Sequence, residues 1–391
     1  MKPAWPVLAA FLFAGAPAAA LAQQGPPQGG FGQRQGVPGR PMPPGGPPGA
    51  QQGAPMPDIQ PAMRWVDVHF HLVADRQQGS MDFVGAVRTA LEDMDRAGIA
   101  VAVVMPPPHI ESQQGYDYPS FASALKRHPQ RFAFLGGGWT LNTVIHKYAD
   151  PATVTGDVKR KFVASAEGIL NGGAVGFGEM AVLHLSATQN HPFEQVSADH
   201  PLFLALAEVA GQRGVPIELH LDAVDRADAP PPEHYAVPPN PPRLKENIAG
   251  FERLLAHDRR ARIVWAHGGS DPLGMQTPSL VGRLMDKHSN LSMSLRVIPD
   301  VGRARNKVLV AGAVDPAWLE LFKRHPDRFM LGTDTFSIAP GNRSAGPGAM
   351  FSQRNLPKLA AHNRLLAALP PDLAKKIGDE NPRRIYRLTG N

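Results

Sequence analysis

Short apolar runs alternate along most of the chain with longer stretches in which apolar residues recur every three or four positions. Short runs are typical of strands, and a run without polar residues, such as 99–105, is typical of a strand buried on both faces of a parallel sheet. The spacing in 82–97 is that of one helix face, and Gly98 suits the end of such a helix. The pattern therefore predicts strands that alternate with helices.

The same criteria apply to the rest of the chain. The predicted strands are 65–71, 99–105, 132–135, 174–178, 215–221, 262–266, 291–295 and 329–331. The predicted helices are 82–97, 120–127, 154–170, 202–212, 244–256, 279–287, 316–324 and 357–369. Strands that alternate in this way with helices favour an α/β fold with a closed (β/α)8 TIM barrel over an open sheet.

The first 62 residues have a different composition. Residues 1–22 contain an early lysine, an apolar run and an ending of small residues, which is the pattern of a secretory signal peptide cleaved after Ala22. This run is too short for a membrane span, and we expect none elsewhere. Residues 23–62 are rich in Gly, Pro and Gln, so we expect a disordered low-complexity tether. The sequence thus predicts an exported protein, periplasmic or secreted, with one barrel domain at 63–391.

Composition narrows the kinds of partner. The chain has no cysteine, which excludes thiolate ligands for a metal. Its net charge of +6 is mild and spread out, and no basic stretch is interleaved with aromatic residues, so we expect no nucleic-acid partner. A small-molecule substrate fits this composition, and the sequence leaves a homo-oligomer open.

The first predicted strand carries the clearest candidate chemistry. Asp67, His69 and His71 alternate with apolar residues, and a period of two places the three polar side chains on one face. Polar groups on a half-buried strand need partners, and neutral imidazole is the commonest metal ligand. A divalent metal is therefore one interpretation, and ordinary hydrogen-bonded histidines are the other.

Four further polar residues come at the ends of predicted strands. They are Glu179, His220, His267 and Asp334. In a (β/α)8 barrel the carboxyl ends of all strands meet at one rim, where the active site lies. Each residue alone has a structural explanation, but ligand-type residues at several strand ends together indicate a metal site.

These residues carry a family resemblance. The motifs are Asp67-Val68-His69-Phe70-His71, Gly178-Glu179-Met180, Glu218-Leu219-His220, Ala266-His267-Gly268-Gly269 and Gly332-Thr333-Asp334. The set resembles the signature of the amidohydrolase superfamily, more closely its amidohydrolase-2 branch, whose usual C-terminal ending residues 381–386 also resemble. Two features depart from the branch, because a glutamate stands where many members have a carboxylated lysine, and an export signal is atypical of its cytosolic enzymes.

The resemblance implies a ligand set and a metal. His69, His71, His220 and Asp334 would bind Zn²⁺ or a similar first-row ion such as Mn²⁺, with one or two ions per chain. His267 would bind a second ion or polarise the substrate through a hydrogen bond.

An ion with an open coordination position can activate water, which gives the carboxylates catalytic roles. Asp334 can take the proton from that water and pass it to the leaving group. Glu179 can bridge two ions or act as a base beside one, and the sequence leaves both roles open. Glu218 and Asp67 are expected to be hydrogen-bond partners of the ligands.

Loops beyond the strands supply the candidate substrate contacts. Arg296 directly follows the strand at 291–295 and suits a substrate carboxylate. Trp139 is a candidate wall of the pocket, and His109 and His184 are candidate contacts in loops. Solvent-facing side chains are the alternative for each of them.

Three functions remain open from the sequence. The first is metal-dependent hydrolysis of an ester, lactone, amide or related bond, with Asp334, His267 and Glu179 as catalytic residues. The second is a single-metal lyase, a decarboxylase or hydratase, since the branch includes such enzymes. The third is a non-catalytic exported metal-binding protein.

Overall fold

The structure is a computed structural model that describes residues 59–73, 81–108, 115–186, 192–299, 304–339 and 347–388. The predicted signal peptide, most of the predicted tether and His109 lie outside these ranges. The last residues of that tether contact the folded domain, since Ile59 is buried and the backbone N–H of Ala62 donates to the side-chain oxygen of Asn363 at 3.4 Å. Among the helices in the described ranges, none combines the length and apolar character needed to cross a membrane.

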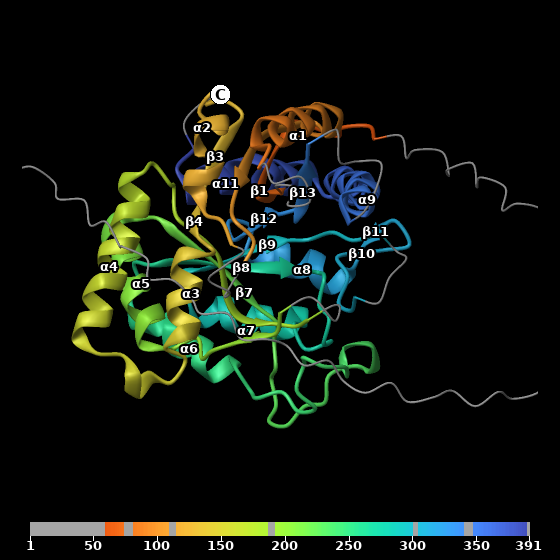
Figure 1. Cartoon of the computed structure of the whole chain (residues 1–391). Helices are drawn as coiled ribbons and strands as arrows, with labels where there is room; N and C mark the ends of the chain where they lie inside the picture. The colour runs from red at the N-terminus through yellow and green to blue at the C-terminus, as the bar shows by residue number, and fades with distance from the viewer. Residues whose placement is uncertain are drawn as a thin grey trace, which may run out of the picture. The chain divides into compact units, whose positions relative to one another are not determined.

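Parallel strands form the centre of the domain. In sheet order they are β3 (Phe132–Phe134), β2 (Ile99–Val104), β1 (Trp65–Val73), β12 (Phe329–Leu331), β9 (Leu291–Leu295), β8 (Arg262–Gly268), β7 (Pro216–Leu221), β5 (Phe177–His184) and β4 (Gly136–Gly137). The two ends of this row belong to one stretch of chain, because only Leu135 separates β3 from β4. The described strands therefore close on themselves, and this parallel α/β arrangement is consistent with the predicted TIM barrel (Figure 1).

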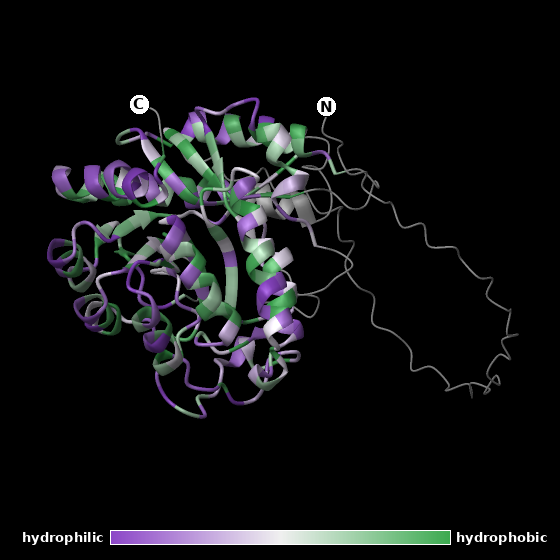
Figure 2. Cartoon of the chain, turned by 90° about the vertical axis from the view of Figure 1, so that its left-hand side faces the viewer, coloured by the Kyte–Doolittle hydropathy of each residue, from purple (hydrophilic) through white to green (hydrophobic). Residues whose placement is uncertain are grey.

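The helices surround the strands. They are α1 (Phe83–Ala97), α2 (Ala122–Leu125), α3 (Thr140–Lys147), α4 (Gly156–Asn171), α5 (Pro201–Arg213), α6 (Ile248–His257), α7 (Pro278–Lys287), α8 (Pro316–Arg324), α9 (Pro347–Ala368), α10 (Pro371–Lys375) and α11 (Asn381–Tyr386), with a π-helix at Lys376–Glu380. Short 3-10 helices occur at Tyr118–Ser120, Pro151–Thr153 and Glu233–Tyr235. In Figure 2 the strands are mostly green and the outer faces of the helices are largely purple, as expected for amphipathic helices that cover a buried sheet.

Four short strands complete the sheet structure. Strand β6 (Glu194–Gln195) pairs antiparallel with β5, and β13 (Thr335–Ile338) pairs parallel with β1. Strands β10 (Leu309–Val310) and β11 (Ala313–Val314) form a separate hairpin.

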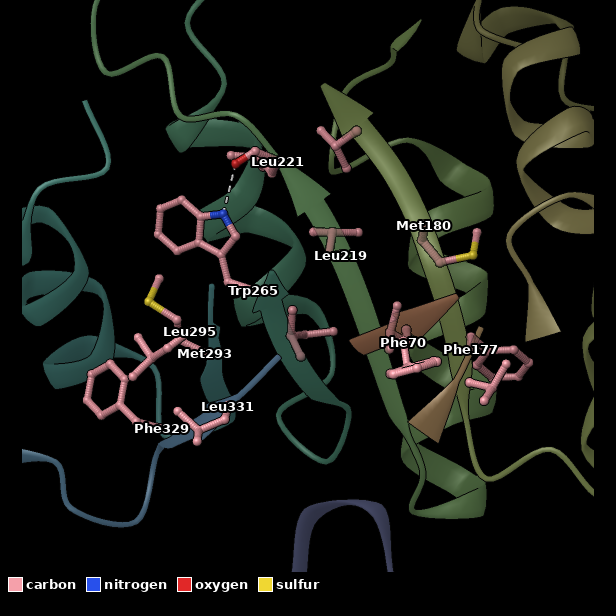
Figure 3. Close-up of a cluster of buried hydrophobic side chains, with 14 of the residues drawn as sticks. Phe70, Phe177, Met180, Leu219, Leu221, Trp265, Met293, Leu295, Phe329 and Leu331 are labelled. Atoms are coloured by element: carbon pink, nitrogen blue, oxygen red, sulfur yellow. Dashed lines mark hydrogen bonds between the residues drawn. The ribbon is translucent and has the colours of Figure 1, made fainter. Parts of the chain in front are cut away.

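The core lies between the strands and the helices (Figure 3). Trp265 of β8 is fully buried, packs against Phe251 of α6 with ring centroids 5.1 Å apart, and donates from Nε1 to the carbonyl oxygen of Leu221 at 2.9 Å. Burying one large apolar side chain stabilises a fold by about 1.5–3 kcal/mol. Because the chain has no disulfides, buried residues such as Trp265 and Phe329 supply much of its stability. A smaller buried cluster joins Ile385 and Tyr386 of α11 to β1, β2, β8 and β12.

Most predicted elements are confirmed, but two have clearly different bounds and several short elements, among them α10 and α11, were not predicted. The strand predicted at 174–178 begins at Phe177 and continues to His184, because Gly173, with φ of 101°, turns the chain after α4, and β6 extends the pairing beyond the barrel. Glu179 therefore lies inside a strand and not after one. The helix predicted from Pro357 begins at Pro347, with Pro357 in its interior. Helix α3 was not predicted.

Candidate metal centre

Strand β1 and the residues after β12 place three ligand-type side chains together. His69 and His71 are fully buried, and their Nε2 atoms lie 3.0 Å apart. Oδ1 of Asp334 lies 3.3 Å from Nε2 of His71 and 3.9 Å from Nε2 of His69. Ligands that bind one Zn²⁺ at about 2.0–2.1 Å in a tetrahedral site lie about 3.3 Å from each other, so these three atoms have the spacing of a shared ion.

Glu179 lies between two pairs of imidazoles. Its Oε2 is 3.4 Å from Nε2 of His69 and 3.5 Å from Nε2 of His71. Its Oε1 is 2.6 Å from Nδ1 of His220 and 3.7 Å from Nε2 of His267. One carboxylate thus faces His69 and His71 with one oxygen and His220 and His267 with the other.

The backbone at two of these residues is unusual. His267 and Asp334 have positive φ values of 69° and 54°, a region that residues other than glycine adopt rarely. Such conformations occur at functional sites, where the surrounding structure holds them. His267 lies near the end of β8 and Asp334 follows β12, and both side chains face the candidate ligands of β1.

Hydrogen bonds to the Nδ1 atoms of His69 and His71 fix the orientation of these two candidate ligands. Nδ1 of His69 donates to Oε1 of Glu218 at 2.9 Å, and Nδ1 of His71 donates to the carbonyl oxygen of Met105 at 2.9 Å. Both Nε2 atoms are thereby directed into the site, as is common for histidines that bind metals. Glu218 also accepts from Ser294 at 2.9 Å. The sequence expectation for Glu218 agrees with this placement.

Asp67 ties β1 to the residues before Asp334. Its carboxylate accepts from the backbone N–H of His69 at 3.1 Å, and from the N–H and hydroxyl of Thr333 at 3.0 and 2.5 Å. Burial raises the pKa of Asp67 to about 6, although these hydrogen bonds oppose the increase.

The carboxylates and imidazoles shift each other's protonation. Burial lowers the pKa of His220, but the nearby carboxylates of Asp222 and Glu179 outweigh it and raise the pKa to about 10. For His69, burial is likewise outweighed by Glu179, which contributes to a pKa well above its ordinary value. Burial raises the pKa of Glu179, yet these imidazoles hold it well below its usual range. Buried carboxylates here require positive charge, which protonated imidazoles or a metal ion can supply.

His267 supplies the test of whether these residues fit a metal. Its Nε2 is buried and has no hydrogen-bond partner within the described ranges. Burial, assisted by the nearby His220 and His69, holds the pKa of His267 well below its ordinary value, so the ring is neutral. A buried neutral imidazole nitrogen among carboxylates and other imidazoles is a donor that suits a first-row divalent ion.

The predicted substrate contacts lie at different distances from this centre. Arg296 reaches it, because Nη2 lies 3.0 Å from Oδ2 of Asp334 and Nη1 donates to Oγ of Ser270 at 3.1 Å. His184 packs edge-on against His220, with ring centroids 4.4 Å apart. Trp139 is half-buried between β4 and α3, and a Cβ atom at Gly115 would meet its ring.

Sequence reasoning missed several residues around the site. Asn142 of α3 bonds to the carbonyl oxygen of Glu179 and to the backbone N–H of Ala181, and Lys358 of α9 donates to the carbonyl oxygen of Asp334. Asp222 follows His220 by two positions, a spacing that could have identified it. Glu194 of β6 is fully buried, and burial raises its pKa to about 8.

Comparisons with known proteins give a family match and several similar structures. The amidohydrolase family model, in its amidohydrolase-2 form, matches residues 66–388. No curated protein sequence matches the chain. Among solved structures, the chain is similar to a dihydroxybenzoic acid decarboxylase from Polaromonas sp. JS666 with bound manganese and the inhibitor 2-nitroresorcinol (13% identity over 84% of this chain and 98% of that one, TM-score 0.48).

Two other solved structures are similar over comparable lengths. One is a probable 2-pyrone-4,6-dicarboxylic acid hydrolase from Acinetobacter baumannii with citric acid bound (13% identity, 83% and 100% of the two chains, TM-score 0.47). The other is 4-oxalomesaconate hydratase from Rhodopseudomonas palustris (13% identity, 83% and 95%, TM-score 0.43). The family match includes all the strands of the ring and all six candidate ligands. The chain belongs to the amidohydrolase family.

Proposed function

We propose that this protein is a metal-dependent hydrolase that cleaves an ester, lactone, amide or related bond of a small molecule. The observation that carries the proposal is the position of Glu179, whose two carboxylate oxygens face different pairs of imidazoles. A carboxylate so placed suits a site with two ions, which is a common arrangement in enzymes that activate water for hydrolysis.

The residues divide between the two halves of such a site. His69, His71 and Asp334 would hold one ion, and His220 and His267 would hold the other, with Glu179 between them. Nitrogen and oxygen donors of this kind suit Zn²⁺ and Mn²⁺. When bound, the metal lowers the pKa of water and polarises the bond to be cleaved.

Asp334 is the proposed proton acceptor. Burial raises the pKa of its carboxyl, but the guanidinium of Arg296 outweighs burial and holds that pKa well below its usual range. The carboxylate is therefore ionised at neutral pH, with Oδ2 held by Arg296 and Oδ1 facing His71. It can accept a proton from the attacking water and return it to the leaving group.

A single-metal lyase is the second candidate, and Arg296 is the observation that favours it. Its guanidinium lies in the site, and its Nε is buried with no hydrogen-bond partner in the described part of the chain. A substrate carboxylate could satisfy that group, as a decarboxylase or hydratase acting on an acid requires.

Metal content of the purified protein tests the proposal. We expect two ions per chain in the wild type and at most one in Glu179→Ala, whereas Glu320→Gln, at an exposed glutamate of α8, should match the wild type. One ion in both the wild type and Glu179→Ala would favour the lyase. No ion after metal is offered back would reject both enzymes.

The position of solvent oxygen in the product separates the reactions, because hydrolysis labels the acid, hydration labels a new hydroxyl group and decarboxylation leaves the organic product unlabelled. Turnover of a panel of esters, lactones and amides in ¹⁸O-labelled water should place one label in the acid product. The protein could instead bind metal tightly and turn over no substrate of the hydrolase or lyase panels, so that Asp334→Asn causes no loss of activity. That outcome would indicate a metal-binding protein.

A further inference from the structure

A small cavity opens beside the candidate metal centre, between the residues that follow β7 and those that follow β8. Its lining includes His220 and Asp222 from the end of β7, and His267, Ser270 and Gln276 from the end of β8 and the loop after it. Since the two histidines belong to the proposed ligands, a group in this cavity would be attached to the substrate close to the reacting bond.

Asp222 and Gln276 give the lining of the cavity two hydrogen-bond acceptors. Oδ2 of Asp222 accepts from the backbone N–H of Leu185 at 3.1 Å, and Oδ1 lies 3.7 Å from Nε2 of His220. Gln276 is 4% exposed, and its side-chain oxygen has no hydrogen-bond partner within the described ranges. A buried acceptor without a partner is unfavourable, so a donor on a ligand would be stabilised here.

The wall is also held in place before any ligand binds. Asp271 accepts hydrogen bonds from the backbone N–H groups of Leu273, Gly274 and Gln276 at 2.8 to 2.9 Å, and from the side chain of Asn306 at 2.7 Å. These bonds fix the loop that carries Gln276. A pre-formed wall distinguishes ligands better than a wall that must first become ordered.

The size of the cavity restricts the group that fits. It has room for about one water-sized group, which is enough for a hydroxyl or an amino group and too little for a ring or a carboxylate. Carboxylates would also be repelled by Asp222.

We propose that this cavity is a specificity subsite for a hydroxyl or amino substituent next to the bond that the enzyme cleaves. The inference rests on the proposed function, because it places the reacting bond at the metal centre. Gln276 and Asp222 accept hydrogen bonds from the substituent, and a substrate without it leaves the side-chain oxygen of Gln276 without a partner in the described part of the chain.

Binding of small acids to the metal-loaded protein tests the subsite without requiring turnover. The probes are acetate, glycolate and glycine, which share a carboxylate and carry no substituent, a hydroxyl or an amino group. We expect calorimetry to show that glycolate or glycine binds the wild type about 10-fold more tightly than acetate. In Gln276→Met this preference should fall below about 3-fold, since methionine has similar size and no strong acceptor.

Two controls make the result decisive. Gln212→Met, at an exposed position of α5, should keep the wild-type preference. Metal content and melting temperature are measured on the same samples, so loss of metal, which would reject the proposed hydrolase, is distinguished from loss of the subsite. The subsite would be overturned if the three acids bound equally or if none of them bound. It would also be overturned if Gln276→Met kept the preference, because the acids would then be chelating the metal.

Discussion

Tyr386 donates a hydrogen bond from its hydroxyl to Oε2 of Glu218 at 2.5 Å, while Oε1 of the same carboxylate accepts from His69 at 2.9 Å. All three side chains are fully buried. One carboxylate therefore connects the last described helix, α11, to a proposed metal ligand on the first strand. The conformation of the C-terminal helix and the orientation of His69 depend on each other through this contact.

Removing the charge of Glu218 should weaken metal binding. In Glu218→Gln we expect the metal dissociation constant to rise by about 10–100-fold, because one neutral amide oxygen replaces the two charged oxygens that accept from His69 and Tyr386. Tyr386→Phe should have a smaller effect in the same direction, and Tyr148→Phe, at the end of α3, should have none. Competition with a chromophoric chelator measures these constants, and wild-type affinity in Glu218→Gln would show that His69 is held by other contacts.

Asn142 should be required for stability, because it satisfies backbone groups around Glu179. Its amide donates to the carbonyl oxygens of Glu179 and Gly138 at 2.8 and 2.9 Å, and its oxygen accepts from the N–H of Ala181 at 3.1 Å. Asn142→Leu leaves these groups buried without partners, so the free energy of unfolding should fall by about 3 kcal/mol or more.

Chemical denaturation of metal-free protein measures this change. Asn142→Asp keeps an acceptor for the N–H of Ala181. It should lose less stability than Asn142→Leu only if the bond to Ala181 accounts for much of the loss in Asn142→Leu. Asn171→Leu, at the exposed end of α4, should change the free energy of unfolding by less than about 0.5 kcal/mol. A similarly small change in Asn142→Leu would contradict the assignment.

The placement of the candidate ligands was largely predictable from the sequence. A strand period of two places His69 and His71 on one face. A parallel barrel brings the carboxyl ends of its strands to one rim, so the position of His220, His267 and Asp334 after apolar runs was enough to predict that they lie near each other. No knowledge of side-chain packing enters this reasoning.

Contacts made by the folded chain could not be predicted in the same way. The position of Arg296 after its strand suggested a substrate carboxylate, which stays a prediction, and gave no sign of its contact with Asp334. Helix α3 is short, with Asp117 of a different loop accepting from the backbone N–H of Thr140 at its start, so neither length nor a local capping residue identified it. Asn142 lies on that helix, and its three partners are brought to it only by tertiary structure.

Metal binding should release protons. In the metal-free protein the carboxylates of Asp222 and Glu179 outweigh burial and raise the pKa of His220 to about 10, and the pKa of His69 is also raised. Both rings are protonated at pH 7 and must lose a proton to bind an ion, so affinity should fall by up to about tenfold for each proton per pH unit as pH decreases from 9 to 6. Calorimetry in buffers with different ionisation enthalpies counts the protons, and a count of zero would exclude these two residues as ligands.

His362 should make the domain less stable in mild acid, independently of the metal. It is fully buried on α9, where Nδ1–H donates to the carbonyl oxygen of Lys358 at 2.8 Å and Nε2 accepts from the N–H of Val297 at 3.1 Å. A proton on Nε2 would face that N–H, and burial lowers the pKa of His362 to about 4 although the carbonyl oxygens of Lys358 and of Leu295, the latter 3.3 Å from Nε2, oppose the decrease. The unfolded chain, with an ordinary pKa near 6.5, therefore binds a proton between pH 6.5 and 4 that the native protein does not bind.

This difference in proton binding decides how the free energy of unfolding changes with pH. Where the unfolded state binds more protons, the free energy of unfolding falls as pH falls, so His362 contributes full stability above about pH 6.5 and loses about 3 kcal/mol by pH 4. His362→Gln does not titrate, and we expect its stability to decline less than that of the wild type by roughly this amount over the same range, in chelator, by urea denaturation. Loss of the stacking between His362 and Trp65, whose rings lie 5.9 Å apart, lowers the stability of the variant equally at every pH and so leaves the slope unaffected. Parallel curves for the two proteins would mean that His362 is protonated in the folded chain, which would require Val297 to move away from Nε2.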